Sequence, residues 1–184
     1  EQLKPIVERS LSARDENAVS AGARLACGMA LVHAEADALA RRCVSGSVPM
    51  RQAAAATFAQ HVTIAGFRSI CEEMLASLFG DVDLAVRKEA ASTFRHFQGD
   101  QLADYLGLVE AFASSPALAD EPHYLLRALS EATVTLEEPT CLVCERLLEA
   151  GGERLIDLTS RYALDADTVS KLVLRVYAQS SDAT

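Results

Sequence analysis

The sequence contains no tryptophan, and only 5% of its residues are aromatic. It also has no apolar run of about 18 residues, so we expect no membrane-spanning helix. Runs of β-branched residues are few, whereas Ala and Leu are abundant. This composition favours helices that pack closely through small side chains. Half of the 184 residues are hydrophobic, which is enough for one domain with a sizeable core.

Cysteines are few and irregularly spaced. Their number, five, is odd, which does not suggest the disulfide framework of a small secreted protein. Cys27, Cys43 and Cys71 fall at apolar positions of predicted helices, where a free thiol packs as a small hydrophobic group. We therefore expect a reducing, cytoplasmic location.

Recognisable catalytic and cofactor-binding motifs are also missing: the sequence has no GxGxxG, Walker A, GxSxG or HExxH pattern. The only metal-like motif is "CLVC", Cys141 to Cys144, which lacks a second CxxC to complete a zinc site. Packing is its favoured interpretation, with redox sensitivity and metal binding as alternatives. We predict no catalytic residue, no metal site, no cofactor and no small-molecule ligand, although catalytic groups that converge from distant segments would leave no motif.

Net charge is −9 and is unevenly distributed. Between Arg41 and Phe97 there are seven Lys or Arg residues and five acidic residues. Between Gln98 and Asp157 there are three Lys or Arg residues and twelve acidic residues. DNA binding depends on a positive surface, so we do not expect a nucleic-acid partner. The middle of the chain is better suited to an acidic segment of a protein partner.

Two segments of the sequence repeat the same pattern at a fixed interval. "PMRQAAAATFAQH" begins at Pro49, and "AVRKEAASTFRHF" spans Ala85 to Phe97. Aligned without gaps, they share five residues that are 36 positions apart, namely Arg51/Arg87, Ala54/Ala90, Ala55/Ala91, Thr57/Thr93 and Phe58/Phe94. Each is predicted to be a helix whose N-cap residue, Ser47 or Asp83, lies in a short polar turn.

Another predicted helix precedes each turn, near Leu31–Val44 and at Phe67–Phe79. Gly66 and, more weakly, Gly28 mark the junctions between helix pairs. In the later matching helix, spacing assigns Val86, Ala90, Phe94 and Phe97 to the core. The same spacing places Lys88, Glu89, Ser92 and Arg95 on the outer side.

Similar pairs are expected outward along the chain. "PIVERSLSA" and "DENAVSAGARLACGMA" form one pair, and helices at about Gln101–Ala113 and from near Pro122 form another. The first helix carries an apolar flank that includes Leu3 and Ile6. Because such helices bury their apolar stripes by stacking, we predict an all-α fold, a right-handed α-solenoid of about four or five antiparallel helix pairs. Residues 1–184 would form a single domain, with 180–184 as a frayed tail.

"DVDLAVRKEAASTF" resembles the second half of a HEAT repeat in its Asp83, Val86, Arg87 and Ala90. "SVPMRQAAAATF" matches it with Ser47 in place of the Asp, and the interval of 36 is shorter than the roughly 40–47 residues usual for HEAT repeats. The resemblance implies a structural Asp–Arg ladder between repeats, made here by Arg51, Asp83 and Arg87. It also implies a scaffold that binds macromolecules along its curved face.

The predicted function is a non-catalytic protein–protein interaction scaffold or recognition segment of a larger intracellular protein, of the kind found in bacterial multidomain proteins. The absence of an initiator Met and of a signal peptide fits an excised piece of such a protein. Its candidate binding residues are Gln52, Gln60, Lys88, Arg95 and His96. The alternatives are a HEAT-like accessory enzyme of lyase or base-excision type, with a pocket on its concave face, and a structural spacer.

Overall fold

The computed structural model describes residues 3–97 and 99–132, and all the regular elements in these ranges are helical. The all-α prediction is therefore confirmed for this part of the chain. The α-helices are α1 (Lys4–Leu11), α2 (Glu16–Val32), α3 (Asp37–Val44), α4 (Val48–His61), α5 (Arg68–Phe79), α6 (Leu84–Ala91), α7 (Leu106–Ala113), α8 (Ala117–Asp120) and α9 (His123–Ala132). The 3-10 helices are η1 (Ala34–Ala36), η2 (Ala65–Phe67), η3 (Ser92–His96) and η4 (Gly99–Tyr105).

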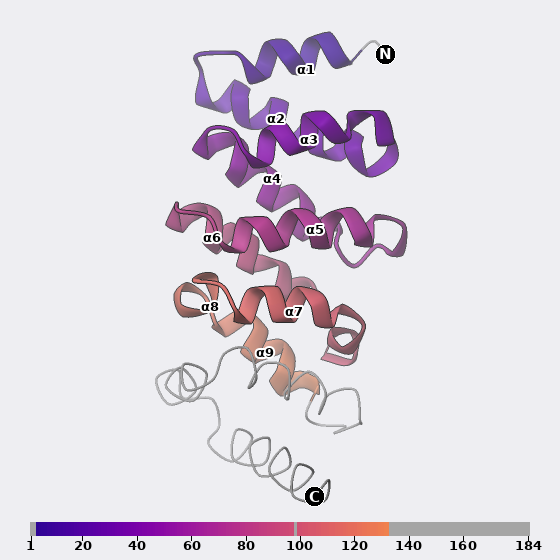
Figure 1. The fold of residues 1–184 in the computed structure, drawn as a ribbon, viewed down its shortest axis with the longest axis vertical. Helices are drawn as coiled ribbons and strands as arrows, with labels where there is room; N and C mark the ends of the chain where they lie inside the picture. Colours follow the sequence, from indigo (N-terminus) through magenta and orange to yellow (C-terminus); the bar gives the residue numbers. More distant parts are fainter. Residues whose placement is uncertain (1–2, 98, 133–184) are drawn as a thin grey trace, which may run out of the picture. The chain divides into compact units, whose positions relative to one another are not determined.

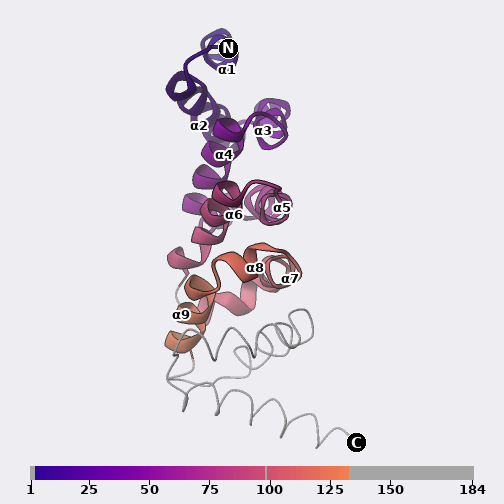
Figure 2. The ribbon, with the colours of Figure 1, turned by 90° about the vertical axis from the view of Figure 1, so that its left-hand side faces the viewer.

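The chain divides into two compact units, Glu1–His96 and Phe97–Thr184. In the first unit α2 packs on α4, and α4 packs on α6, so these helices follow one another along one side (Figures 1 and 2). On the other side α3 packs on α5, and both also contact α4. The core of this unit is therefore built around α4.

The position of α4 explains its unusual composition. Its seven successive residues from Ala53 to Ala59 are all buried, because α2, α3, α5 and α6 surround it. Five of the seven are alanines, which let the neighbouring helices approach closely. Phe58 is the largest side chain in this run and is fully buried.

In the second unit α9 packs on η4, and α7 contacts both η4 and α8. The ring of Phe97 meets that of Tyr105 edge to face, with centroids 4.7 Å apart. Phe112 and Leu108 of α7 are fully buried. The CLVC motif at Cys141–Cys144 and the expected frayed tail at 180–184 lie outside the described residues.

The matching helices begin as predicted, but only one of the two predicted caps forms. The Asp83 carboxylate accepts hydrogen bonds from the backbone N–H groups of Ala85 at 2.9 Å and Val86 at 3.2 Å. Ser47 occupies the N-cap position of α4, but its side chain makes no capping bond. Pro49 in the first turn has no N–H, which removes one of the donors that such a side chain would bind.

Two predicted helix boundaries are wrong. Gly28 lies inside α2, which continues to Val32, and α3 begins only at Asp37 after the extended backbone of His33. The weak junction assigned to Gly28 and the helix start near Leu31 are thus corrected. Gly66, in contrast, lies between α4 and α5 as expected.

The helix expected to span Ala85–Phe97 is α-helical only to Ala91 and continues as the tighter η3. Its core assignment is confirmed, since the four predicted core residues are at most 4% exposed: Val86, Ala90, Phe94 and Phe97. Ser92, which was placed on the outer side, is buried, and its hydroxyl donates to the Glu89 carbonyl at 2.7 Å. Similarly, the segment before Leu106 is 3-10 helix, so α7 starts later than the predicted Gln101.

Candidate functional site

The arginines of the predicted ladder both hold the turns that precede their helices. The Nη1 of Arg51 donates to the Gly46 carbonyl at 2.6 Å. The Nη1 of Arg87 donates to the Val82 carbonyl at 3.1 Å and to the Asp81 carbonyl at 2.7 Å. Gly46 and Val82 are 36 positions apart, as the two arginines are. The same side chain thus makes the same bond at the two matching places.

The carboxylate that binds Arg51 is that of Asp81, whereas the resemblance implied Asp83 for this ladder. Arg51 donates from Nε to Oδ2 at 2.7 Å and from Nη2 to Oδ1 at 3.1 Å, a two-pronged pair with both side chains at most 16% exposed. Asp81 Oδ1 also accepts the Asp83 backbone N–H at 2.8 Å. Asp83 serves as the cap of α6. Because both acids lie in the same "GDVD" turn, their sequence positions alone did not separate the two roles.

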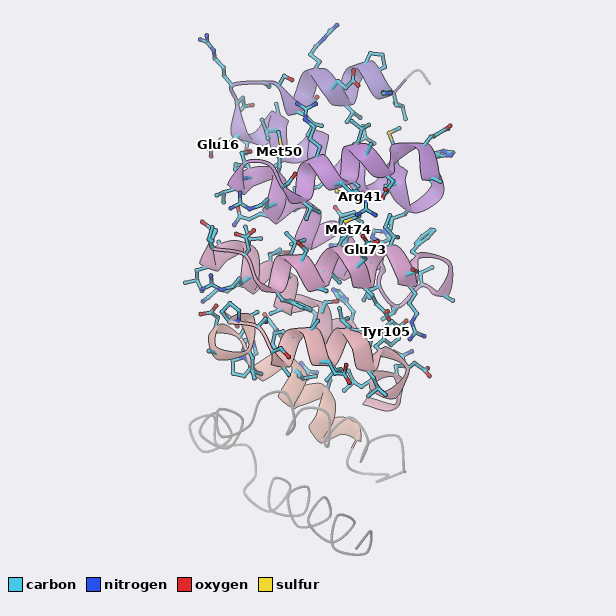
Figure 3. All side chains as sticks on the ribbon, viewed as in Figure 1. Glu16, Arg41, Met50, Glu73, Met74 and Tyr105 are labelled. Carbon is cyan, nitrogen blue, oxygen red and sulfur yellow. The ribbon has the colours of Figure 1, made fainter. Side chains whose placement is uncertain are left out.

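A second connection between helices lies on the exposed surface, where Arg41 of α3 reaches Glu73 of α5 (Figure 3). Arg41 donates to Glu73 Oε1 at 2.6 Å and to Asp37 Oδ2 at 2.7 Å. More than half of the Arg41 and Glu73 side chains is exposed, so this pair adds little to stability.

The candidate binding residues lie on α4, α6 and η3. We call them the polar stripe: Gln52, Gln60, Lys88, Arg95 and His96. Four of the five are exposed, and Gln52 is half-buried. Gln52 and Gln60 are eight residues apart and so share one face of α4. Because α4 packs on α6 and η3, the structure brings the stripe onto neighbouring helices of one unit.

The polar stripe carries positive charge and neutral hydrogen-bonding groups at neutral pH. Lys88 and Arg95 supply the positive charge. Desolvation by the surrounding protein and the adjacent positive charge of Arg95 lower the pKa of His96 below its ordinary value, which favours the neutral imidazole. This combination suits an acidic surface that also offers hydrogen-bonding groups.

The three described cysteines are buried and free, as their predicted packing role requires. A thiol hydrogen bond with Cys43, together with burial, raises the pKa of Cys27. Burial raises the pKa of Cys71 to about 12. Since the thiolate is the reactive and metal-binding form, the thiols of Cys27 and Cys71 are poor nucleophiles. The pKa of Cys43 moves the other way, because the hydrogen bond with Cys27 lowers it. Within residues 3–97 and 99–132, no group of three or more His, Cys, Asp or Glu side chains could hold a metal ion.

A groove of about 780 Å³ lies near the start of the first unit. Its lining comes from α1, α2, η1 and α3 and includes Leu3, Leu25, Met29, Val32 and Leu39. The apolar flank expected on the first helix is exposed at Leu3 and Ile6. The groove itself was not predicted, because it requires the relative positions of α1 and α3, although both walls carry apolar residues in the sequence.

Comparison of the chain with models of known protein families, with curated proteins and with solved structures finds no match. Of the helices in the described part of the chain, none combines the length and the apolar character needed to cross a membrane.

Proposed function

We propose that this chain is a HEAT-like α-solenoid that acts as a protein-interaction scaffold, and that the polar stripe binds an acidic segment of a partner protein. The observation that carries the repeat assignment is the pair of equivalent bonds from Arg51 to Gly46 and from Arg87 to Val82. A residue type shared by two positions can arise by chance. A shared residue whose side chain makes the same contact at the same interval favours a repeated structural unit.

The packing of the helices also supports a scaffold. α2, α4 and α6 contact in succession, with α3 and α5 beside them, as expected when helix pairs bury their apolar stripes against their neighbours. Such stacking leaves one face of successive helices available for binding. Gln60, Lys88, Arg95 and His96 are exposed on α4, α6 and η3 of this unit and supply polar groups for such binding.

Charge supports an acidic segment as the target. Lys88 and Arg95 are both exposed and give the polar stripe its positive charge. Complementary charge accelerates association and disfavours partners of the wrong sign. We place the scaffold in the cytoplasm of the source cell, where the three buried cysteines would stay reduced.

The test is affinity capture from a bacterial lysate, quantified by mass spectrometry, with a matched pair of variants. One variant carries Lys88→Glu and Arg95→Glu. The control carries Arg9→Glu and Arg14→Glu, which change the net charge equally at exposed positions away from the stripe. Both variants must first show the circular dichroism and melting of the parent.

We expect proteins that the parent and the control recover and that the stripe variant loses. Addition of salt should release the same proteins, because exposed charge pairs are screened. Equal recovery by all three chains would reject the polar stripe as the binding surface. No specific recovery by the parent would favour the structural spacer.

A further inference from the structure

The groove at the start of the first unit has two walls of different charge. Lys4 of α1 lies on one wall, and Glu35 of η1 lies on the other. Both side chains are exposed, and neither has an ion-pair partner among the residues that the structure describes. Among the described residues, the groove therefore offers one unpaired charge of each sign.

The surface between these charges is apolar and open. Leu3, Leu25 and Val32 are 48%, 40% and 61% exposed, which is unusual for large apolar side chains gathered around one hollow. Gly28 lies in the same lining, and nothing is within 4 Å of the place where its Cβ would be. The floor of the groove thus has space for a side chain from outside.

We propose that this groove is the contact face between two copies of the chain. In a two-fold dimer the same patch must complement itself, so it needs both signs of charge as well as apolar surface. A two-fold axis running along the groove places α1 of each copy over η1 and α3 of the other. Lys4 of each copy then faces Glu35 of the other, and the apolar side chains between them are buried from water.

The charges favour a second copy over a different partner. A groove with charge of one sign would call for a partner of the opposite sign, whereas this groove is electrically complementary to itself. The proposal does not depend on the polar stripe, which lies on α4, α6 and η3. It can fail while the proposed function stands, and the reverse is also true.

The direct test uses charge reversal, read by native mass spectrometry and sedimentation over a range of concentrations. The parent chain is expected to form a concentration-dependent dimer. Lys4→Glu gives a chain with two acidic walls, and Glu35→Lys gives one with two basic walls. Each variant alone should dimerise at least about tenfold more weakly than the parent, since like charges then face each other.

The mixture of the two variants is the decisive sample. Equimolar Lys4→Glu and Glu35→Lys chains should form heterodimers in preference to either homodimer, and the double variant should dimerise like the parent. A parent that stays monomeric at every concentration would overturn the proposal. So would single variants that dimerise as well as the parent.

A second pair of variants tests the apolar part. Val32→Glu places a charge in the groove, whereas Val82→Glu places one at a position that is 92% exposed and outside the groove. Both sites are already exposed, so the fold should tolerate either change, which circular dichroism checks. The dimer should be lost in the first variant and kept in the second. Retention in both, or loss in both, would contradict a dimer formed through this groove.

Discussion

α4 and the segment formed by α6 and η3 carry the same five residues at matching positions but use them in different surroundings. α4 is enclosed by four helices and continues as an α-helix to His61. α6 leaves the α-helical form after Ala91 and tightens into η3. Where α4 has Ala53 and Ala59, the later segment has Glu89 and Arg95, both exposed. The shared residues form a common framework, and the differing residues determine what can pack against it.

The matching threonines show how much the surroundings matter. Thr57 donates its hydroxyl hydrogen to the Ala53 carbonyl at 2.8 Å. At the equivalent carbonyl, that of Glu89, the donor is the Ser92 hydroxyl at 2.7 Å. Thr93 Oγ1 is buried and has no hydrogen-bond partner within the described residues. The Ser92 hydroxyl, at the position where α4 has Ala56, therefore makes the hydrogen bond that the matching threonine makes in α4.

The largest expected effect tests the common framework. Phe58 and Phe94 are matching residues, and each is at most 1% exposed. Phe58→Ala and Phe94→Ala should each lower the free energy of unfolding by about 3–5 kcal/mol, because they leave cavities in a packed core. Urea unfolding measures the loss, and the milder Phe→Leu changes serve if an alanine variant does not fold. A loss below about 1 kcal/mol at either position would contradict an equivalent core role.

The next effect separates the two acids of the turn before α6. Asp81→Asn removes the charge that binds Arg51 and should cost about 2 kcal/mol, the range for hydrogen bonds to charged groups. Asp83→Asn should cost less than about 0.5 kcal/mol, because Asn caps a helix about as well as Asp. Thermal or urea unfolding of the two variants gives the comparison. Equal losses would mean that the structural assignment of these two roles is wrong.

A smaller effect of opposite sign is expected at the matching threonines. Thr93→Val removes a buried hydroxyl that has no partner and should be neutral or stabilise by up to about 1 kcal/mol. Thr57→Val removes a hydroxyl that is bonded and should destabilise by about 1 kcal/mol. Chemical denaturation of both variants under one condition provides the measurement. Destabilisation of the same size at both sites would contradict the difference between the two helices.

The smallest effect is a pH dependence. Burial and Arg95 lower the pKa of His96, so the unfolded chain binds a proton more readily than the folded one. Stability should therefore fall as the pH drops through the ordinary His value of about 6.5. His96→Gln, which installs the residue that α4 has at this position, should remove that part of the fall. An unchanged pH profile in the variant would show that His96 does not contribute.

Features that depend on local spacing could be predicted from the sequence. The burial of Val86 and Phe94 follows from helical periodicity, and the Asp83 cap follows from a short acidic side chain before an apolar run. The exposure of Gln60 and Lys88 follows from the same periodicity. These assignments needed no knowledge of the rest of the chain.

Features that depend on competition between groups could not be predicted in this way. Ser92 is buried because the helix tightens around its hydroxyl bond, which periodicity does not anticipate. Arg51 binds Asp81, whereas the resemblance gave this ladder role to Asp83, whose side chain caps α6 instead. The Lys4 and Glu35 walls of the groove lie on separate helices, and their relation appears only in three dimensions.

If the 36-residue interval is a structural unit, the fold should accept a second copy of it. A second copy of residues 48–83 would be inserted after Asp83. The first junction then has Asp83 before Val48, in the N-cap position that Ser47 holds in the parent, and the second is the natural Asp83–Leu84. The control would insert residues 48–73, which is out of step with the interval. Far-UV circular dichroism and thermal unfolding of both chains give the measurement. We expect the in-step chain to keep its helicity per residue and to melt in one transition at or above the parent's temperature. Loss of helicity or early melting equal to that of the control would contradict this expectation.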